Sequence, residues 1–419
     1  MPTRNGSTLS ELFTVIAPRD ALALLLAAVT PVARTERVAL GDARGRVLDA
    51  DWNATELLPA FARALMDGYA VRAADTHGAG EASPAYLRLV GEVLMGRLPD
   101  CRVAPGEAVR IHTGAMLPEG ADAVVMVEET NQHGAEIEVL AATPAGDNLL
   151  FPGEDVRPGT VAVAAGTRLD VAALGGLAAL GAATVGVRGR PRIAILSTGD
   201  EVVAVGERPA GAQVRDVNAT TVAATVAGAG GEPVPLGIVP DDRALLTARA
   251  RAALDGADAL VISAGSSVSH RDITAEVVSA LGAPGILAHG IAIRPGKPTI
   301  LALCDGKPVI GLPGNPASAV VVAWRILAPL VRRLGGEAGV PLDGDGTIDA
   351  VLALDLPSRP GREEYVPCRL DRATDPPRAT PHFGESNLIF TLVRSDGLAI
   401  VPIDRSGLHA GERVRVVPR

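Results

Sequence analysis

Aromatic residues are scarce in this chain of 419 residues, where Phe, Tyr and Trp together make up only 2%. Its cores must therefore be built from Ala, Val, Leu and Ile, and the hydrophobic content of 47% is sufficient for that. Glycine (47) and proline (32) are abundant, which predicts many turns and excludes a helical bundle. A chain of this length is expected to form about two to four domains.

Several features that would mark other classes of protein are missing. The three cysteines, Cys101, Cys304 and Cys368, form no CxxC pair, so we expect a reducing, cytoplasmic compartment. The seven histidines include no HExxH or HxH pair, which argues against a dedicated zinc site. The most apolar stretch, residues 21–29, is shorter than the roughly 20 residues of a membrane helix, and the N-terminus lacks the apolar region of a signal peptide. The net charge of −9 argues against nucleic-acid binding.

The pattern of apolar and turn-forming residues changes twice along the chain. Residues 86–139 alternate short apolar runs with turns, which predicts a small β module. From residue 170, apolar strands alternate with helical segments of 10–15 residues, which predicts βαβ units and a largely parallel sheet. We expect Asn218 and Asp272 to begin two of these helices. After about residue 337 only strands and turns follow, so a separate C-terminal β domain is expected.

Two polar loops are expected at the carboxyl ends of parallel strands, where ligands bind in such sheets. The first is STGDE, residues 197–201, where Gly199 permits a tight turn and Asp200 and Glu201 offer oxygen ligands for Mg²⁺. The second is SAGSSVS, residues 263–269, whose hydroxyls precede Asp272 and could cradle an anion at a helix start. Ordinary turns and helix caps would use the same residues.

Two further loops carry cations and helix-start residues. RPGKP, residues 294–298, holds Lys297, one of only two lysines in the chain, and its prolines favour a rigid site for phosphate or another oxoanion. LPGNPASA, residues 312–319, places Asn315 as a cap and Pro316 at the first helical position, with the Ser318 hydroxyl available to a ligand. An exposed turn and a well-formed helix start are the alternatives.

The motifs occur in a familiar order: MDGYAV (66–71), TGAMLPEGADAVVMVE (113–128), GED (153–155), STGDE, RPGKP and LPGNPASA. Over about residues 20–405 the chain resembles the molybdopterin molybdenumtransferases, the MoeA proteins and the C-terminal part of gephyrin. Six ordered motifs are far more specific than a single short pattern.

The resemblance implies an α/β plus β fold with four domains. These are a discontinuous N-terminal domain (1–52 and 145–190), an inserted β domain (53–144), a parallel-sheet molybdopterin-binding α/β domain (191–337) and a C-terminal β-barrel (338–419). It also implies a homodimer with an active site shared between subunits. The implied reaction inserts molybdate into adenylylated molybdopterin and releases AMP with the help of Mg²⁺, and a molybdopterin adenylyltransferase would be a partner.

Site residues follow from the motif positions. The implied catalytic residues are Asp67, Thr113, Glu201, Asp272 and Lys297. The implied ligand-binding residues are Ser197, Thr198, Gly199, Ser267, Arg294, Lys297, Pro313, Asn315, Pro316, Ser318, Arg362 and Ser386. The implied Mg²⁺ ligands are Glu201 and Asp272 together with Asp241 or Asp242. Asp155 matches the aspartate of the family's GED motif.

The chain departs from the family pattern at several positions. Ala64-Leu65 replaces Ser-Ala before MDGYA, two glycines are missing from the 264–269 loop, and Pro367 stands where an arginine is expected. These changes keep open a paralogue that prefers tungstate, or a binding or scaffold protein that has lost turnover. A pterin-binding adenylyltransferase is a third alternative, but that family lacks the two β domains, and the chain length argues against it.

Overall fold

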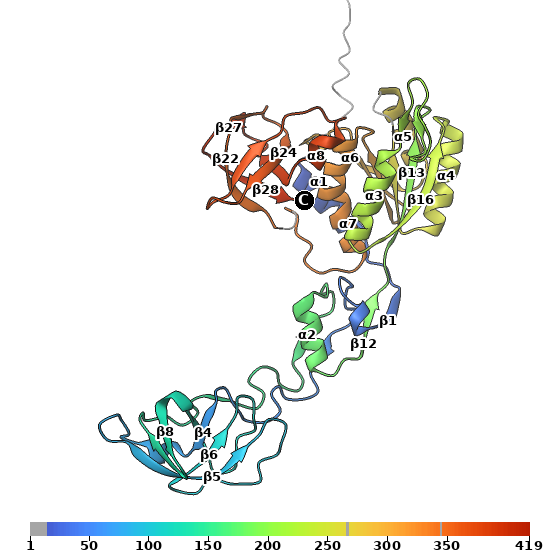
Figure 1. The fold of residues 1–419 in the computed structure, drawn as a ribbon. Helices are drawn as coiled ribbons and strands as arrows, with labels where there is room; N and C mark the ends of the chain where they lie inside the picture. The colour runs from blue at the N-terminus through green and yellow to red at the C-terminus, as the bar shows by residue number, and fades with distance from the viewer. Residues whose placement is uncertain (1–14, 265–267, 344–345) are drawn as a thin grey trace, which may run out of the picture. The chain divides into compact units, whose positions relative to one another are not determined.

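The computed structural model describes residues 15–264, 268–343 and 346–419, except for the side chains of 268–272. The chain divides into two compact units, each described here by itself (Figure 1). The larger unit comprises the chain up to residue 50 together with 165–174 and 183–419, and the smaller unit comprises 51–164 and 175–182. In the part of the chain described, no helix is long and apolar enough to cross a membrane.

The smaller unit is built on a six-stranded sheet in the order β7-β4-β6-β5-β9-β8. Only β5 and β6 pair in parallel. Apolar side chains fill both faces, so the central strand β4 is buried along its whole length. The sheet strands are β4 (Gly68–Val71), β5 (Ala85–Val93), β6 (Glu107–Ile111), β7 (Ala123–Met126), β8 (Thr130–His133) and β9 (Glu136–Val139). Two short pairs join it: β2 (Trp52–Asn53) with β11 (Val161–Val163), and β3 (Arg63–Ala64) with β10 (Leu149–Leu150).

The larger unit contains a six-stranded sheet in the order β16-β13-β17-β21-β20-β18, in which only β20 runs antiparallel to its neighbours. Its strands are β13 (Arg192–Thr198), β16 (Glu232–Val239), β17 (Ala259–Ser263), β18 (Pro284–His289), β20 (Ile300–Cys304) and β21 (Lys307–Leu312). Strands buried on both faces explain the continuous apolar runs in the sequence. An antiparallel ribbon, β1 (Thr35–Ala39) with β12 (Thr184–Arg188), precedes this sheet.

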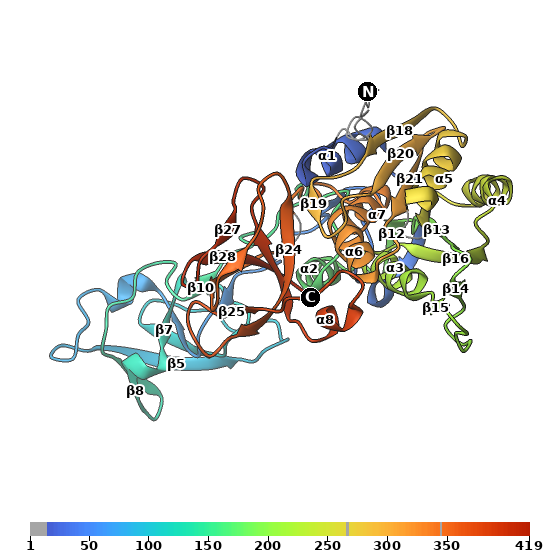
Figure 2. The ribbon, with the colours of Figure 1, turned by 90° about the horizontal axis from the view of Figure 1, so that it is seen from above.

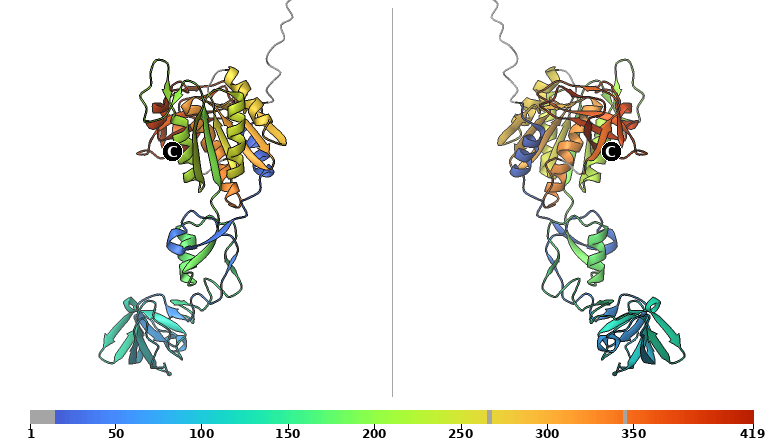
Figure 3. Two further views of the ribbon diagram at one scale, coloured as in Figure 1. Left: turned by 90° about the vertical axis from the view of Figure 1, so that its right-hand side faces the viewer. Right: turned by 90° about the vertical axis from the view of Figure 1, so that its left-hand side faces the viewer.

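Helices cover both faces of this sheet (Figure 3). On one face lie α1 (Pro18–Ala28), α3 (Val217–Gly228) and a long helix formed by α6 (Pro316–Val322), a π-helical turn (Ala323–Leu327) and α7 (Ala328–Leu334). On the other face lie α4 (Arg243–Gly256) and α5 (Val268–Ser279). The remaining long helix, α2 (Val171–Ala179), lies between β11 and β12 in the chain.

The C-terminal segment forms a closed barrel beside α6 and α8 (Figure 2). Strands β24-β25-β22-β28-β26 pair in sequence and β26 pairs back to β24, so that ring has no free edge. The barrel strands are β22 (Ile348–Leu352), β24 (Glu363–Asp371), β25 (Arg378–Pro381), β26 (Gly397–Val401) and β28 (Arg413–Pro418). The short strand β19 (Ile293–Arg294) adds in parallel to β24, β23 (Leu356–Pro357) pairs with β27 (Gly407–Leu408), and α8 (Ile389–Val393) follows β25.

The structure confirms the predicted α/β plus β fold class but corrects several helix starts. Asp216, and not Asn218, caps α3, because its carboxylate accepts a hydrogen bond from Ala219 N at 3.0 Å. Helix α5 begins at Val268, so Asp272 lies one turn inside it. Asn315 holds the capping position of α6 but makes no side-chain cap, and its Nδ2 donates to Ser386 Oγ.

Candidate active site

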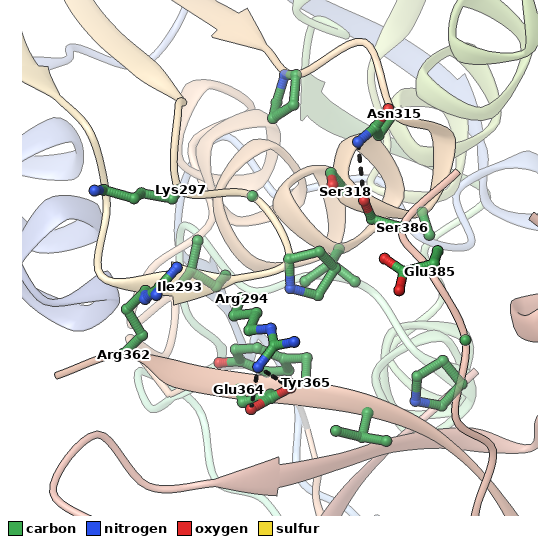
Figure 4. Close-up of a pocket in the computed structure, with 18 of the residues that line it drawn as sticks. Ile293, Arg294, Lys297, Asn315, Ser318, Arg362, Glu364, Tyr365, Glu385 and Ser386 are labelled. Atoms are coloured by element: carbon green, nitrogen blue, oxygen red, sulfur yellow. Dashed lines mark hydrogen bonds and ion pairs between the residues drawn. The ribbon is translucent and has the colours of Figure 1, made fainter. Parts of the chain in front are cut away.

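A cavity of about 1190 Å³ lies between the α/β sheet and the barrel of the larger unit (Figure 4). The α/β side contributes the RPGKP and LPGNPASA loops, and the barrel side contributes residues 356–367 and 382–392. Seven predicted ligand-binding residues line it: Arg294, Lys297, Pro313, Asn315, Ser318, Arg362 and Ser386. The structure therefore gathers side chains that are up to 92 positions apart, from Arg294 to Ser386, around one cavity.

The RPGKP loop is held rigidly between the barrel and α6. Strand β19 pairs with β24, and the Arg294 guanidinium lies 3.3 Å from the mostly buried carboxylate of Glu364, which also accepts a hydrogen bond from Ser358 Oγ at 2.6 Å. Gly296 has a φ of +124°, and a Cβ there would lie 2.5 Å from Val322 Cγ2. Only glycine fits this turn without displacing α6, which explains why the motif places glycine between its prolines.

The LPGNPASA loop is tied to the barrel segment by two hydrogen bonds. Asn315 Nδ2 donates to Ser386 Oγ at 2.9 Å, and Ala317 N donates to Ser386 O at 3.0 Å. Ser318 lies in the first turn of α6 and is 4% exposed. Figure 4 shows Asn315, Ser318 and Ser386 on the opposite side of the cavity from Lys297 and Arg362. Neutral hydroxyl and amide groups thus face two cations.

The predicted strand-end loops do begin at one edge of the sheet. Ser197 of β13 pairs in register with Ser263 of β17, which pairs with Leu312 of β21. Asn218 Nδ2 donates to Ser263 Oγ at 2.8 Å and to Gly314 O at 2.9 Å, so it connects two of these loops. Within the described residues, Ser197 Oγ and Asn218 Oδ1 are buried without a hydrogen-bond partner. Unsatisfied buried polar atoms are uncommon and suit a site that a ligand completes.

Acidic side chains follow β13 and β16 at the same edge. Thr198 Oγ1 donates to Asp241 Oδ1 at 2.9 Å, and Asp200 N donates to Asp241 Oδ2 at 3.3 Å. Asp242 caps α4 by accepting from Leu245 N at 2.8 Å. Glu201 Oε2 lies over Gly199, 2.8 Å from where a Cβ would stand, so the glycine makes room for this carboxylate.

These carboxylates offer the hard oxygen donors that Mg²⁺ prefers. In the described part of the chain, no three His, Cys, Asp or Glu side chains are grouped closely enough to hold a metal by themselves. Mg²⁺ is usually held by only one or two carboxylates together with substrate phosphates, and the donors present fit that kind of site. Ser267 and the side chain of Asp272 lie outside the described residues.

Asp67 and Thr113 meet in the smaller unit. The Asp67 carboxylate accepts hydrogen bonds from Thr113 N at 2.7 Å and from Thr113 Oγ1 at 2.8 Å. Both residues are exposed. The backbone hydrogen bond, followed by the hydroxyl one, lowers the pKa of Asp67 below its usual value, because both stabilise the charged form. Two motifs 46 positions apart therefore form one charged, exposed pair.

Other residues of the cavity were missed by sequence reasoning. Besides Glu364, they include Arg359, Tyr365, His382, Phe383 and Glu385. Tyr365 is almost fully buried, and the guanidinium of buried Arg325 lies 5.4 Å from the centre of its ring. Burial is the largest factor that raises the pKa of Tyr365. A motif search gives little signal for these residues, because only the barrel closure brings them to the cavity.

Comparison with known families covers nearly the whole chain. The model "MoeA N-terminal region (domain I and II)" matches residues 16–181, "Probable molybdopterin binding domain" matches 194–333, and "MoeA C-terminal region (domain IV)" matches 349–418. These matches define the class of the protein: a molybdopterin-binding α/β domain combined with β domains before and after it.

Comparison with individual proteins identifies the family within this class. The molybdopterin molybdenumtransferase of Nostoc sp. is 35% identical over 390 residues, covering 91% of this chain and 88% of that protein. The enzyme of the same name from Bacillus subtilis is 32% identical over 389 residues, covering 91% and 89%. The crystal structure of a molybdopterin biosynthesis moeA protein from Pyrococcus horikoshii superposes with a TM-score of 0.81 at 29% identity, covering 97% of this chain and all of that one. The chain belongs to the molybdopterin molybdenumtransferase family.

Proposed function

We propose that this protein is an enzyme of molybdenum cofactor biosynthesis that inserts molybdate into adenylylated molybdopterin and releases AMP with the help of Mg²⁺. The observation that carries the proposal is the cavity lined by three cations from two chain segments, Arg294 and Lys297 of the RPGKP loop and Arg362 of the barrel. The named relatives support it, because they are molybdopterin molybdenumtransferases and this chain matches most of their length.

The proposed reaction needs a cationic pocket, because the net charge of −9 on the protein would otherwise repel the molybdate dianion. Lys297 and Arg362 would attract the dianion, and Arg294 would join them while remaining anchored to Glu364. Ser318 and Ser386, which also line the cavity, would bind the substrate through neutral hydrogen bonds without adding charge. Preorganised donors of this kind cost little reorganisation at the moment of reaction.

We assign the acidic loops to Mg²⁺. Glu201 with Asp241 or Asp242, and Asp272 from α5, would hold the ion while the substrate phosphates complete its coordination. The bound ion would neutralise charge on the pyrophosphate as the bond to AMP breaks. Ser197, Thr198 and Gly199 at the end of β13 would bind the phosphates, with Ser267 assigned to the same group, and Pro313 and Pro316 would fix the shape of the loop before α6.

The direct test is to incubate the purified chain with adenylylated molybdopterin, Mg²⁺ and either molybdate or tungstate, and to measure AMP. Release that depends on both molybdate and Mg²⁺ is expected. Release with tungstate but not molybdate would establish a tungstate-preferring paralogue. Binding of the substrate without any release would establish a binding or scaffold protein and overturn the proposed enzyme.

We also propose a homodimer whose active site combines Asp67 and Thr113 of one subunit with the cavity of the other. Two inactive variants, Asp67→Asn and Glu201→Gln, test this arrangement. If the site is shared between subunits, mixed dimers contain one intact site and regain AMP release, whereas each variant alone stays inactive. Mixtures that remain inactive, although exchange of subunits is verified, would place the whole site within one chain.

Three finer assignments complete the proposal. The chain is divided into four domains at the boundaries predicted from the sequence, it acts in the cytoplasm, and a molybdopterin adenylyltransferase supplies its substrate. Limited proteolysis with mass spectrometry tests the boundaries, because cuts should fall near residues 52, 145, 190 and 338.

A further inference from the structure

The cavity is too large for an oxoanion alone. At about 1190 Å³ it exceeds the roughly 300–1,000 Å³ of pockets that hold drug-sized molecules, so it has room for an organic group beside the oxoanion. The cations Lys297 and Arg362 lie on one side (Figure 4), which leaves the opposite side for a part of the ligand that is not anionic.

The opposite side is formed by the segment Phe383–Ser386, which is anchored at both ends. His382 N donates to Pro367 O of the barrel at 2.7 Å, and Ser386 O accepts from Ala317 N of α6 at 3.0 Å. Leu388 N closes a turn on Glu385 O at 3.0 Å. The segment is thus positioned by the barrel and the α/β domain before any ligand binds, and this lowers the entropic cost of binding.

Phe383 gives this segment an aromatic surface. It lines the cavity and is 61% exposed, although phenylalanine is usually buried in proteins and aromatic residues are scarce in this chain. Leu388, which is 50% exposed, also lines the cavity. An exposed aromatic ring in a cavity wall that also carries an exposed leucine is suited to stacking on a flat heteroaromatic ring.

Glu385 gives the segment a carboxylate that faces the cavity from the side away from Lys297 and Arg362 (Figure 4). Within the described residues its side chain makes no hydrogen bond or ion pair. A carboxylate repels phosphate and molybdate, so it is favourable only where the ligand presents N–H donors. Its two oxygens accept two parallel hydrogen bonds, but it has no donor of its own when ionised.

We propose that Phe383 and Glu385 recognise the pterin ring of the substrate, with Phe383 stacking on the ring and Glu385 binding its 2-amino and N3–H edge. This inference rests on the proposed function, whose substrate carries two ring systems. The pterin edge places two N–H donors side by side, which matches a carboxylate. Adenine places its amino group beside an acceptor nitrogen, so a carboxylate matches it with only one hydrogen bond.

Two pteridines test the proposal by ligand-observed NMR with the full chain. Pterin carries the 2-amino group, whereas lumazine has a carbonyl oxygen in its place. The wild type should bind pterin about tenfold or more tightly than lumazine, because a hydrogen bond to a charged group is lost and an oxygen then faces the carboxylate. Glu385→Gln should remove most of that preference and leave AMP binding unchanged.

The aromatic contact has a matched control in the same region. Phe390 is 62% exposed but does not line the cavity. Phe383→Ala should weaken both pteridines about tenfold, Phe383→Trp should retain binding, and Phe390→Ala should change neither.

Several results would overturn the assignment. They are equal binding of pterin and lumazine by the wild type, no detectable pterin binding at millimolar concentration, an unchanged preference in Glu385→Gln, or equal losses in Phe383→Ala and Phe390→Ala. The AMP-release assay separates this inference from the proposed function. A chain that selects pterin through Glu385 but releases no AMP would leave the ring recognition intact and refute the enzyme.

Discussion

Two polar regions of the larger unit differ in charge, one formed by loops at strand ends of the α/β sheet and the other by such loops together with the barrel. The loops after β13 and β16 carry carboxylates, with Asp241 bound to Thr198 and Glu201 folded over Gly199. The cavity between α6 and the barrel carries Arg294, Lys297 and Arg362. The first region therefore offers carboxylate oxygens, and the second offers positively charged groups.

The largest expected effect comes from the acidic region. Glu201→Gln should slow AMP release about 100-fold or more, because a neutral amide replaces a proposed Mg²⁺ ligand of similar shape. The fold should remain intact, as judged by thermal unfolding. Glu207→Gln, an exposed change nearby, is the matched control and should leave the rate unchanged. Normal turnover of the Glu201 variant would remove this residue from the mechanism.

A change in the turn of the cationic region should mainly affect stability. Gly296→Ala adds a Cβ close to Val322 and strains a backbone with positive φ, so we expect a loss of about 2–4 kcal/mol in the free energy of unfolding. Gly306 also has a positive φ but no atom within 4 Å of a built Cβ, so Gly306→Ala measures the backbone strain alone. Equal losses in denaturant unfolding would show that the contact with α6 contributes nothing.

Lys297→Ala tests whether the cationic region binds anions. Molybdate affinity, measured by equilibrium dialysis, should fall about tenfold, and the variant should depend less on salt than the wild type because one charge interaction has been removed. Arg372→Ala removes an exposed cation elsewhere in the barrel segment and controls for net charge. Wild-type affinity across a full salt series would contradict a role for Lys297.

The smallest expected effect is a change in the pKa of Asp67, which lies in the smaller unit. Asp67 should titrate below its usual value of about 3.9 in NMR, and Thr113→Val should raise its pKa only part of the way, because the backbone N–H of residue 113 remains. A lowered pKa means that this pair favours the folded state above the unfolded pKa and loses that contribution as pH falls through the folded value. Titration at the usual value in the wild type would show that the hydrogen bonds do not persist in solution.

Local sequence patterns were enough to predict the strands of the α/β sheet and the edge at which their polar loops begin. Ser197, Ser263 and Leu312 share one sheet edge because parallel strands all end on the same side, which a sequence can reveal. Glu364 and Glu385 could not be found this way. They reach the cavity only because β24 pairs with β19 and because Ser386 binds α6, and such long-range contacts leave no periodic signal.

Helix starts were predicted less well, again for a physical reason. Asp216 and Asn218 are both good capping residues two positions apart, and tertiary contacts decide between them. Asn218 lies inside the first turn of α3, where its Nδ2 donates to Ser263 Oγ and Gly314 O and its Oδ1 caps no backbone N–H. Asn315 stands at the capping position of α6 but makes no side-chain cap, and its Nδ2 donates to Ser386 Oγ of the barrel segment.

The bond between Asn315 and Ser386 has a consequence for shortened forms of the chain. A fragment that stopped after α7 would keep every acid of the sheet edge but would lose the half of the cavity wall supplied by residues 356–392. Under the proposed function, such a fragment would keep the acids assigned to Mg²⁺ but would lose Arg362 and Ser386 from the cavity. The barrel is thus an integral wall of the cavity, and a chain without it would leave that cavity open on one side.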